Sequence, residues 1–309
     1  MSKVIRIGTR ASELALWQAH HVQGRLQAAG HKTEIVEITS EGDQTLDVPL
    51  YEMGITGIFT RSLDIALLQD RIDIAVHSLK DVPTALPKNT EQYAVLERAE
   101  PWDILVYKPG KRNETPNPIA TGSLRRKSWW LHQHAGASVV DLRGNVNTRL
   151  KKLQTGKAQA AVFAMAGLDR IDILPQLEKK FGLKYKKLKD LVPAPAQGAI
   201  MVMGRSDDAF SKEACTLLNH EATAHCVHVE RQFLRTLEGG CTAPIGGYAT
   251  IDGDFLKFKG SICSLDGTKY LELERSVPTN EYKTAGETFA KALLASGGEH
   301  LMSELRKSL

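Results

Sequence analysis

The sequence has few cysteines and no paired cysteine motif. Only four occur in 309 residues, at Cys215, Cys226, Cys241 and Cys263. This number and spacing exclude a small disulfide framework and the common cysteine zinc motifs. We therefore expect free thiols in a reducing compartment. Cys241 is unlike the others, because it lies between a glycine pair and an Ala-Pro turn, where no nearby partner explains it.

Long apolar runs are also missing. The longest, Ala160–Leu168, stops at Asp169 and is far too short to cross a bilayer. The N-terminal MSKVIRIG has charge but no apolar core, so it does not read as a secretory signal. We expect a cytoplasmic protein. Hydrophobic residues make up 42% of the chain, enough for the cores of two or three domains.

Neither strong charge nor basic–aromatic alternation is present. The net charge is only +4, which weakly favours acidic ligands. Trp129 and Trp130 after an arginine pair are the one hint of nucleic-acid binding, and core packing explains them better. Glu221, His225 and His228 share one helix face, but His220 to His225 is one residue too long for the metalloprotease motif. We predict neither nucleic acid nor metal as a ligand.

Strand-like and helix-like segments alternate in the first half of the chain. Val4–Ile7 reads as a strand and Glu13–Ala28 as a helix with Ser12 as its N-cap. Lys32–Ile38 and Ile72–His77 read as further strands, with a helix over Leu63–Gln69 before the latter. This order predicts βαβ units, a parallel sheet, and ligand loops at the carboxyl ends of its strands.

The same pattern restarts after residue 100 and changes after about Leu217. The second set of segments is predicted at Ile104–Tyr107, Ile119–Thr121, Ser138–Leu142, Val146–Leu153 and Gln159–Ala166. The last part has a helix, three strands with Asp-Gly turns, and a closing helix, at Glu221–Leu237, Tyr248–Ile251, Leu256–Ser264, Tyr270–Ser276 and Glu281–Ala295. We predict an α/β protein with two lobes forming a cleft, plus a small α+β C-terminal domain with an antiparallel sheet.

Arginines gather where the inferred strands end. They are Arg10, Arg125, Arg126, Arg143, Arg149 and Arg170. Arginine suits bidentate binding of carboxylate or phosphate, and helix starts after Ser12 and Ser123 add backbone donors. A solvated helix face explains single arginines, but not the adjacent pair Arg125 and Arg126, which diverge by about 100° on a helix. Asp81, just past a buried strand, is a general acid/base candidate, although by position alone a turn aspartate before proline is the better explanation.

These residues alone leave several functions open. An anion-binding clamshell without chemistry accounts for the arginines, but gives Cys241 and Asp81 no role. A cysteine acyltransferase needs a base beside Cys241, and no local histidine supplies one.

Six motifs in order carry a resemblance across the whole chain. They are RASELALWQA (Arg10–Ala19), AVHSLKDVP (Ala75–Pro83), SLRR (Ser123–Arg126), LRGNVNTRL (Leu142–Leu150), AQG (Ala196–Gly198) and LEGGCTAPIG (Leu237–Gly246). Together they closely resemble hydroxymethylbilane synthase, also called porphobilinogen deaminase. That family joins four porphobilinogen molecules head to tail, with loss of ammonia, into the linear tetrapyrrole hydroxymethylbilane. It is a transferase of tetrapyrrole and haem biosynthesis.

The resemblance implies a role for each candidate residue. It implies that Cys241 carries a dipyrromethane cofactor through a thioether and that Asp81 is the catalytic carboxylate. It assigns cofactor binding to Lys80, Thr121, Ser123, Arg125, Arg126 and Arg143. It assigns binding of substrate or of the growing chain to Arg10, Ser12, Arg149, Arg170 and Gln197. A thiolate is a strong carbon nucleophile, which fits the role of Cys241.

The resemblance also implies architecture. Two clamshell lobes like those of periplasmic binding proteins are expected, residues 1–98 with 199–216 and residues 99–198, followed by a cysteine-bearing domain at 217–309. The family implies a monomer. The segment 54–62 departs from the family pattern, since Thr56 replaces a lysine and Ser62 replaces a glutamate.

Overall fold

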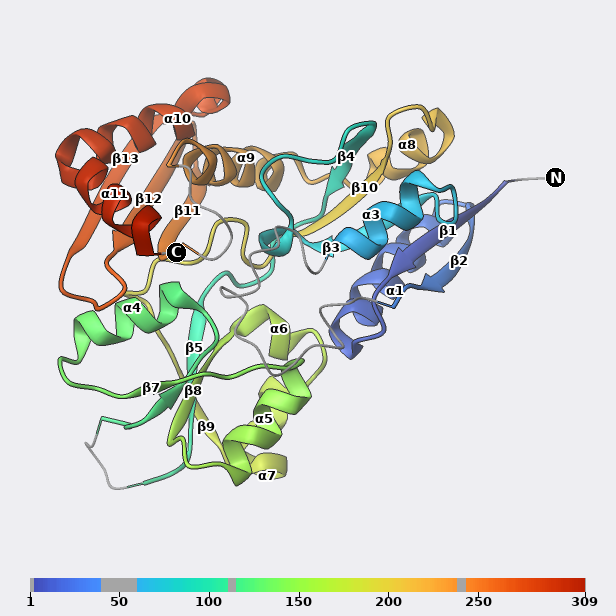
Figure 1. Cartoon of the computed structure of the whole chain (residues 1–309). Helices are drawn as coiled ribbons and strands as arrows, with labels where there is room; N and C mark the ends of the chain where they lie inside the picture. Colours follow the sequence, from blue (N-terminus) through green and yellow to red (C-terminus); the bar gives the residue numbers. More distant parts are fainter. Residues whose placement is uncertain (1–2, 40–59, 111–114, 238–242, 309) are drawn as a thin grey trace. The chain divides into compact units, whose positions relative to one another are not determined.

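The computed structural model describes residues 3–39, 60–110, 115–237 and 243–308 (Figure 1). The chain divides into two units. Unit 1 contains described residues of Met1–Leu46, Ile55–Ala99 and Gly198–Ala224, and unit 2 contains those of Glu100–Gln197 and His225–Leu309. The three-domain division drawn from the resemblance stays a prediction.

Unit 1 is built on a five-stranded mixed sheet in the order β2-β1-β3-β10-β4. Its strands are β1 (Val4–Thr9), β2 (Lys32–Glu37), β3 (Ile74–Ser78), β4 (Thr90–Val95) and β10 (Ile200–Arg205). Its helices are α1 (Glu13–Ala28), α3 (Arg61–Leu68), the short 3-10 turn η2 (Leu79–Asp81), α8 (Ala209–Cys215) and η4 (Thr216–Leu218). The α1 face of the sheet buries a core that includes Ile5, Ile7, Val22 and Val76.

The predicted parallel sheet is only partly right. β1 is parallel to β2 and β3, but β10 is antiparallel to both β3 and β4. The prediction is wrong for β10. No local pattern assigns this strand to the sheet, because its pairing is long-range: Val202 pairs with Val76, 126 positions away. β3 therefore lies between partners of opposite direction, and its carboxyl end remains beside that of β1.

The first part of unit 2 has a second mixed sheet, in the order β7-β6-β8-β5-β9. The strands are β5 (Asp103–Tyr107), β6 (Ile119–Ala120), β7 (Val139–Val140), β8 (Ala160–Ala164) and β9 (Lys184–Lys187). The helices are α4 (Leu124–Gln133), α5 (Val146–Thr155), α6 (Met165–Asp169), η3 (Leu174–Gln176) and α7 (Leu177–Phe181). Parallel pairing holds for β6 with β7 and β8, whereas β5 is antiparallel to β8 and β9.

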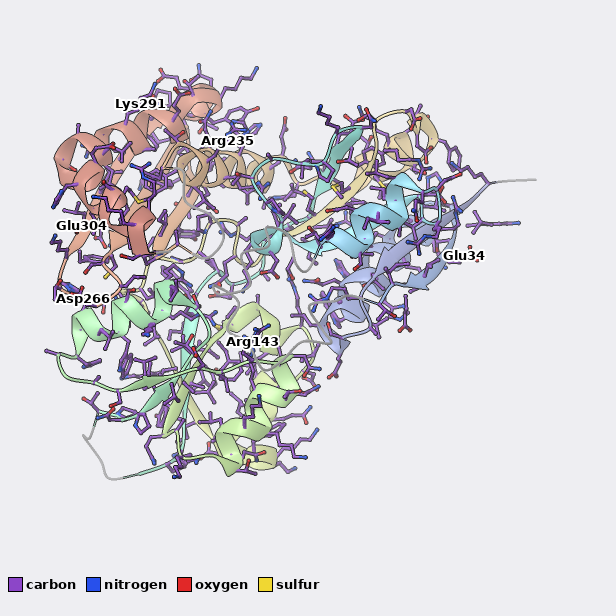
Figure 2. All side chains as sticks on the ribbon, in the orientation of Figure 1. Glu34, Arg143, Arg235, Asp266, Lys291 and Glu304 are labelled. Carbon is purple, nitrogen blue, oxygen red and sulfur yellow. The ribbon has the colours of Figure 1, made fainter. Side chains whose placement is uncertain are left out.

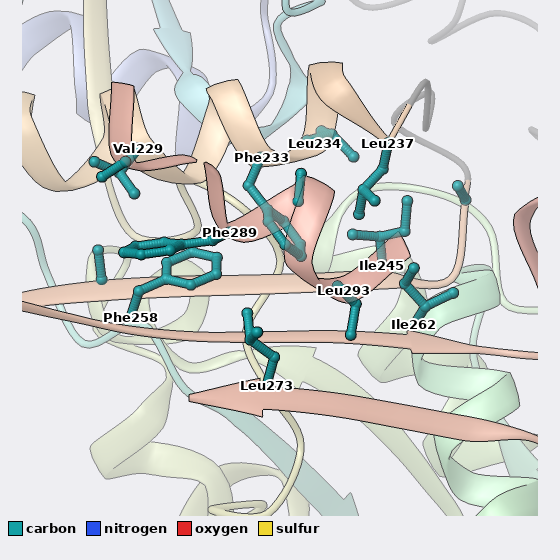
Figure 3. Packing of buried hydrophobic residues seen from close by; sticks show 14 of the residues in the cluster. Val229, Phe233, Leu234, Leu237, Ile245, Phe258, Ile262, Leu273, Phe289 and Leu293 are labelled. Atoms are coloured by element: carbon teal, nitrogen blue, oxygen red, sulfur yellow. The ribbon is translucent and has the colours of Figure 1, made fainter. Parts of the chain in front are cut away.

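The rest of unit 2 is the predicted antiparallel sheet with its helices. Its elements are α9 (Glu221–Thr236, continuing from unit 1), β11 (Ile245–Asp252), β12 (Phe255–Cys263), β13 (Tyr270–Pro278), η5 (Thr279–Glu281), α10 (Tyr282–Leu293), η6 (Leu294–Gly298) and α11 (Glu299–Ser308). Figure 3 shows Phe233, Phe258 and Phe289 packed between the helices and the sheet, with ring centroids 4.8 and 5.2 Å apart along the series. This sheet thus has its own buried core.

One predicted strand proves to be two elements. The apolar run expected as a strand over Gln159–Ala166 is β8 up to Ala164, and α6 begins at Met165. A short buried helix and a buried strand carry the same apolar signal, so composition does not separate them. The strands β4 and β9 and the final helix α11 were not predicted.

Candidate active site

A pocket in unit 1 lies where two parallel strands end. Its volume is about 80 Å³. It is lined by Arg10, Ser12, Leu14, Ala15, Gln18, Thr60, Val76, His77, Ser78 and Asp81. These residues come from the segment between β1 and α1, from α1 itself, from the end of β3, from η2 and from the N-cap of α3. The carboxyl ends of parallel strands are where ligands commonly bind in such sheets.

The start of α1 supplies positive potential to this pocket. Ser12 has extended backbone angles and accepts a hydrogen bond from the Ala15 N–H at 3.4 Å, which confirms it as the N-cap. The helix that follows has 16 residues, and its N-terminus carries a partial positive charge. Arg10 precedes it and lines the same pocket. A carboxylate bound here would meet a guanidinium and the partial positive charge of a helix N-terminus.

Asp81 ends the short turn η2, half-buried at the rim of the pocket. The turn is fixed by two backbone hydrogen bonds, from Leu79 N–H to the Ala199 carbonyl at 3.0 Å and from Val82 N–H to the Leu79 carbonyl at 3.1 Å. Gln18, 2% exposed, donates to Ser78 Oγ at 2.9 Å in the same pocket. Asp81 thus lines the same pocket as Arg10.

The arginine pair of unit 2 is buried around one carboxylate. Arg125 Nη2 lies 2.6 Å from Asp103 Oδ2, and Arg126 Nη2 lies 2.8 Å from Asp103 Oδ1. Both arginines are 6% exposed and Asp103 is fully buried. Their other donors reach the Val192 carbonyl at 2.7 Å and the Val162 carbonyl at 2.9 Å. A solvated helix face is thereby excluded for this pair, as the sequence predicted.

Gln197 joins this cluster. Its amide donates to the Pro101 carbonyl at 2.7 Å and to Asp103 Oδ1 at 3.1 Å, and the residue is 1% exposed. Arg125, Arg126 and Gln197, which lie far apart in the sequence, thus converge on a residue that sequence reasoning missed. The three charged side chains of the cluster sum to one positive charge.

Thr121, Ser123 and Arg143 precede helices α4 and α5. Thr121 is buried and its Oγ1 accepts a hydrogen bond from the Ser123 N–H at 3.2 Å. Ser123 is the N-cap residue of α4, with no capping bond from its side chain. Arg143 is 8% exposed and precedes α5 (Figure 2). These positions put two helix starts and one guanidinium on the lobe that carries the buried arginine pair.

Arg149 and Arg170 come from α5 and from the end of α6. Arg149 Nε donates to the Gly144 carbonyl at 2.6 Å. Gly144 has φ +112°, and a Cβ there would lie 2.7 Å from Thr148 Cγ2, so the turn requires glycine. Burial lowers the pKa of Arg170 to about 10, although Asp169 acts in the opposite direction. Arg149 is therefore held in one orientation by the turn before its own helix.

The segment that follows the predicted cofactor cysteine is anchored by a buried carboxylate. Glu230 on α9 is fully buried and accepts hydrogen bonds from the Ala196 N–H at 2.6 Å and the Ala249 N–H at 2.7 Å. Gly247 N–H also donates to the Pro193 carbonyl at 2.9 Å. The start of β11 is thus tied to the segment that ends in Gln197. Cys241 itself lies outside the described residues.

The predicted site residues fall into groups. Arg10, Ser12 and Asp81 line one pocket of unit 1, and Lys80 is half-buried beside Asp81 without lining it. Arg125, Arg126 and Gln197 meet at Asp103 in unit 2. Sequence reasoning missed Gln18, His77, Ser78 and Asp103. The first three lie within motifs already noted, and Asp103 is marked only by its place at the start of an apolar strand.

In the part of the chain that the structure describes, no three or more His, Cys, Asp or Glu side chains are placed to hold a metal ion. His225, part of the rejected zinc pattern, stacks on Tyr282 with ring centroids 3.8 Å apart. None of the described helices has the length and apolar character needed to cross a membrane.

Comparison with known proteins gives a family. Residues 5–213 match the family described as "Porphobilinogen deaminase, dipyromethane cofactor binding domain", and residues 224–295 match "Porphobilinogen deaminase, C-terminal domain". The porphobilinogen deaminase of Geobacter metallireducens is 38% identical over 98% of this chain and 95% of its own. That of Chloroherpeton thalassium is 38% identical over 99% of each chain.

Solved structures with a likeness to the chain include a probable amino-acid-binding protein of an ABC transporter from Bacillus subtilis. It has 13% identity and a TM-score of 0.41, over 69% of this chain and 89% of the other. The sequence matches, by contrast, cover nearly the whole chain and include both lobes and the C-terminal domain. The chain belongs to the porphobilinogen deaminase family: it is a hydroxymethylbilane synthase that uses a dipyrromethane cofactor.

Proposed function

We propose that Asp81 carries the proton and charge work of each condensation in this enzyme. The observation that supports it most is the pocket of unit 1 in which Asp81 shares the wall with Arg10, Ser12 and Gln18. A carboxylate and a guanidinium in one small pocket match a substrate with both cationic and anionic groups. Porphobilinogen has an aminomethyl group on an α-carbon of its pyrrole ring and an acetate and a propionate on the two β-carbons.

Each condensation breaks one C–N bond and forms one C–C bond. The aminomethyl nitrogen leaves as ammonia, and the freed methylene carbon bonds to the α-carbon of the acceptor pyrrole, which then loses a proton. The pyrrole is cationic between these steps. Asp81 stabilises this cation through the pyrrole N–H and accepts the proton from the α-carbon.

Arg10 and Ser12 hold the incoming substrate by a carboxylate. The guanidinium provides two parallel N–H donors, and the N-terminus of α1 adds backbone donors beside it. This arrangement directs the acidic side chains away from Asp81, where a second carboxylate would be repelled. The aminomethyl group is then left on the side of Asp81.

The cofactor is assigned to Lys80, Thr121, Ser123, Arg125, Arg126 and Arg143, with attachment through Cys241. When bound, the dipyrromethane supplies the pyrrole acceptor for the first condensation. Its acidic side chains fit the uncompensated positive charge around Asp103. A helix start and the Thr121 hydroxyl, which already orders the Ser123 N–H, provide neutral donors beside that charge.

Arg149, Arg170 and Gln197 are assigned to the growing chain. Each added pyrrole brings two further carboxylates, so separate cations are needed beyond those that hold the cofactor. Arg149 is oriented by the Gly144 carbonyl, which accepts a hydrogen bond from its Nε. Gln197 acts at the same place as the arginine pair, because all three contact Asp103.

The setting of the enzyme is also a proposal. We assign it to the cytoplasm, as a monomer that acts on a small molecule and on neither nucleic acid nor a membrane. Cys215, Cys226 and Cys263, the cysteines of the described residues, are buried and form no disulfide with one another, which suits a reducing compartment. The monomer follows from the family resemblance alone.

The decisive experiment is a turnover assay of Asp81→Asn protein whose intact mass shows a loaded Cys241. Loading must be checked first, because the same chemistry can assemble the cofactor. A positioned acid/base contributes about 10²–10⁴-fold, so the variant should lose at least about a hundredfold in rate. Glu97→Gln, an exposed carboxylate of unit 1 outside the pocket, is the matched control. If the cofactor-loaded Asp81→Asn variant has a turnover rate within about tenfold of wild type, Asp81 is a turn residue without a catalytic role.

A further inference from the structure

His77 is a buried histidine with an unsatisfied nitrogen in the wall of the pocket. It lies near the end of β3, is 5% exposed, and lines the pocket together with Arg10 and Asp81. Its Nε2 is buried and has no hydrogen-bond partner. Of the seven such side-chain atoms among the described residues, it is the one whose residue lines this pocket.

The surroundings keep this imidazole neutral. Burial, and then the charge of Arg10, lower the pKa of His77 to about 4. A neutral imidazole has one N–H donor and one acceptor nitrogen. His77 is therefore not a counter-ion for Asp81 at neutral pH, and it offers a neutral hydrogen bond to whatever enters beside Arg10.

Packing alone gives no reason for a histidine at this position. β3 is an apolar strand, Ile-Ala-Val-His-Ser, and its first four residues are buried. Burying a polar atom that lacks a hydrogen-bond partner disfavours folding, and an apolar side chain of similar size would fill the same space without this cost. Buried polar groups left unsatisfied at the edge of a pocket are typical of sites that are completed by a ligand.

The neighbour of His77 indicates which group of the substrate it meets. Arg10 is the charge that acts on His77, so a cationic aminomethyl group is disfavoured on this side and a carboxylate is favoured. The two oxygens of a carboxylate offer several acceptor positions, and a single guanidinium occupies only some of them. A neutral N–H beside Arg10 can take one of the remaining positions without adding charge.

We propose that His77 is a substrate-binding residue whose Nε2–H donates a hydrogen bond to the pyrrole side-chain carboxylate held by Arg10. This inference rests on the proposed role of Arg10 and deepens it. The shared carboxylate has a guanidinium on one side and an imidazole on the other, which fixes the plane of the carboxylate and the ring that bears it. The aminomethyl carbon is thereby held in one orientation relative to Asp81.

The first test separates binding from folding through His77→Leu. Removing an unsatisfied buried nitrogen should leave the melting temperature equal or higher, and the intact mass should still show the cofactor. Losing a hydrogen bond to a charged group should raise KM for porphobilinogen about 10- to 100-fold, with kcat changed far less. His77→Gln, which keeps an N–H, should recover part of the loss. A KM within twofold of wild type, or a fall in kcat with KM unchanged, would overturn the proposal.

A double variant tests whether the two residues share one carboxylate. If they do, Arg10→Met with His77→Leu should raise KM by less than the product of the two single effects, since the second change removes part of an interaction already lost. Multiplicative effects would show that the two side chains bind different groups, which also contradicts the proposal.

A direct measurement uses the unchanged histidine, so it holds even if His77→Leu does not fold. Loaded Asp81→Asn protein with ¹⁵N-labelled histidine is titrated with porphobilinogen, and the Nε2 resonance of His77 is followed. It should keep the shift range of a protonated nitrogen and move on binding, whereas the exposed His20 should not move. No movement of His77 at saturation would overturn the proposal. The His77 resonance reports substrate binding, whereas the Asp81 assay reports turnover. The role of His77 and the role of Asp81 can therefore fail independently.

Discussion

Asp103 Oδ2 lies 2.6 Å from Arg125 Nη2, and both side chains are buried. Burial lowers the pKa of Arg125, and the adjacent carboxylate acts in the opposite direction. The same carboxylate contacts Arg126 and Gln197. Three residues assigned to cofactor or chain binding are thus oriented by one aspartate that contacts no solvent.

Removing the negative charge of Asp103 should lower both the free energy of unfolding and the fraction of protein that carries the cofactor. Breaking a buried ion pair costs about 3–5 kcal/mol, because an uncompensated charge stays behind. We expect Asp103→Asn to lower the free energy of unfolding by that amount, measured by urea denaturation. Intact mass should show a reduced fraction of protein with the cofactor. Asp190→Asn, an exposed aspartate of the same unit, is the control. A loss below about 1 kcal/mol would mean that the arginines do not depend on Asp103.

Asp103 shows where sequence reasoning stops. The sequence indicates that a solvated helix face does not explain the arginine pair, because neighbours on a helix diverge by about 100°, but it does not predict that both side chains are buried. Its partner was not predicted, since Asp103 starts β5 and reads as a polar residue at a strand end. The contact joins residues 22 and 23 positions apart through packing of α4 on the sheet. Local patterns contain no information about that packing.

The elements of the fold likewise divide into those that local sequence patterns predict and those that they do not. β1, α1 and the Ser12 cap follow from periodicity and helix-start chemistry, and the structure confirms them. The antiparallel C-terminal sheet follows from alternation and Asp-Gly turns. The insertion of β10 between β3 and β4 has no local signal, because only the long-range pairing of Met201 with His77 and Val95 determines it.

Arg149 should be needed for elongation but not for loading. Its Nε donates to the Gly144 carbonyl, which holds the guanidinium in one orientation. Hydrogen bonds to charged groups contribute about 1.5–3 kcal/mol, which predicts a loss of tens- to a hundredfold in rate for Arg149→Leu. Native mass spectrometry should show partly elongated species accumulating on protein with a normal cofactor mass.

Lys151→Leu is the control for this variant, because Lys151 is an exposed cation on the same helix. It should leave the rate and the masses unchanged. If Arg149→Leu gives the wild-type distribution of masses and rates, Arg149 lies outside the chain-binding site. If both variants slow elongation equally, general positive charge on α5 is responsible instead.

Cys241 should be the attachment point of the cofactor. Burial raises the pKa of both Cys215 and Cys263 to about 12, so these thiols are not thiolates at neutral pH and are poor nucleophiles. We expect Cys241→Ser to be folded but to show the bare sequence mass and almost no activity. Cys263→Ala should keep the mass of the adduct. An adduct that persists in Cys241→Ser would require another attachment residue.

The stability of unit 1 in acid should depend on Asp73. This side chain is 1% exposed and accepts hydrogen bonds from Arg6 N at 2.8 Å, Nε at 2.9 Å and Nη2 at 2.9 Å. Burial alone raises the pKa of Asp73, but the hydrogen bonds and charge of Arg6 lower it to about 2. The pKa of Asp73 is lower in the folded protein than in the unfolded chain. Ionised Asp73 therefore stabilises the fold at pH values above the unfolded pKa, and this contribution is lost as the pH falls through the folded pKa.

The contribution amounts to about 2 kcal/mol at pH 7, of which about 1 kcal/mol is lost by pH 3. Urea denaturation at several pH values between 7 and 3 should therefore show a steeper loss of stability for wild type than for Asp73→Asn. The two curves should approach each other as the pH falls, because protonation removes from the wild type the charge that the variant already lacks. The exposed Asp254 provides a control, since Asp254→Asn should parallel wild type throughout. A constant difference between wild type and Asp73→Asn across this range would show that Asp73 acts through its packing and not through its ionised form.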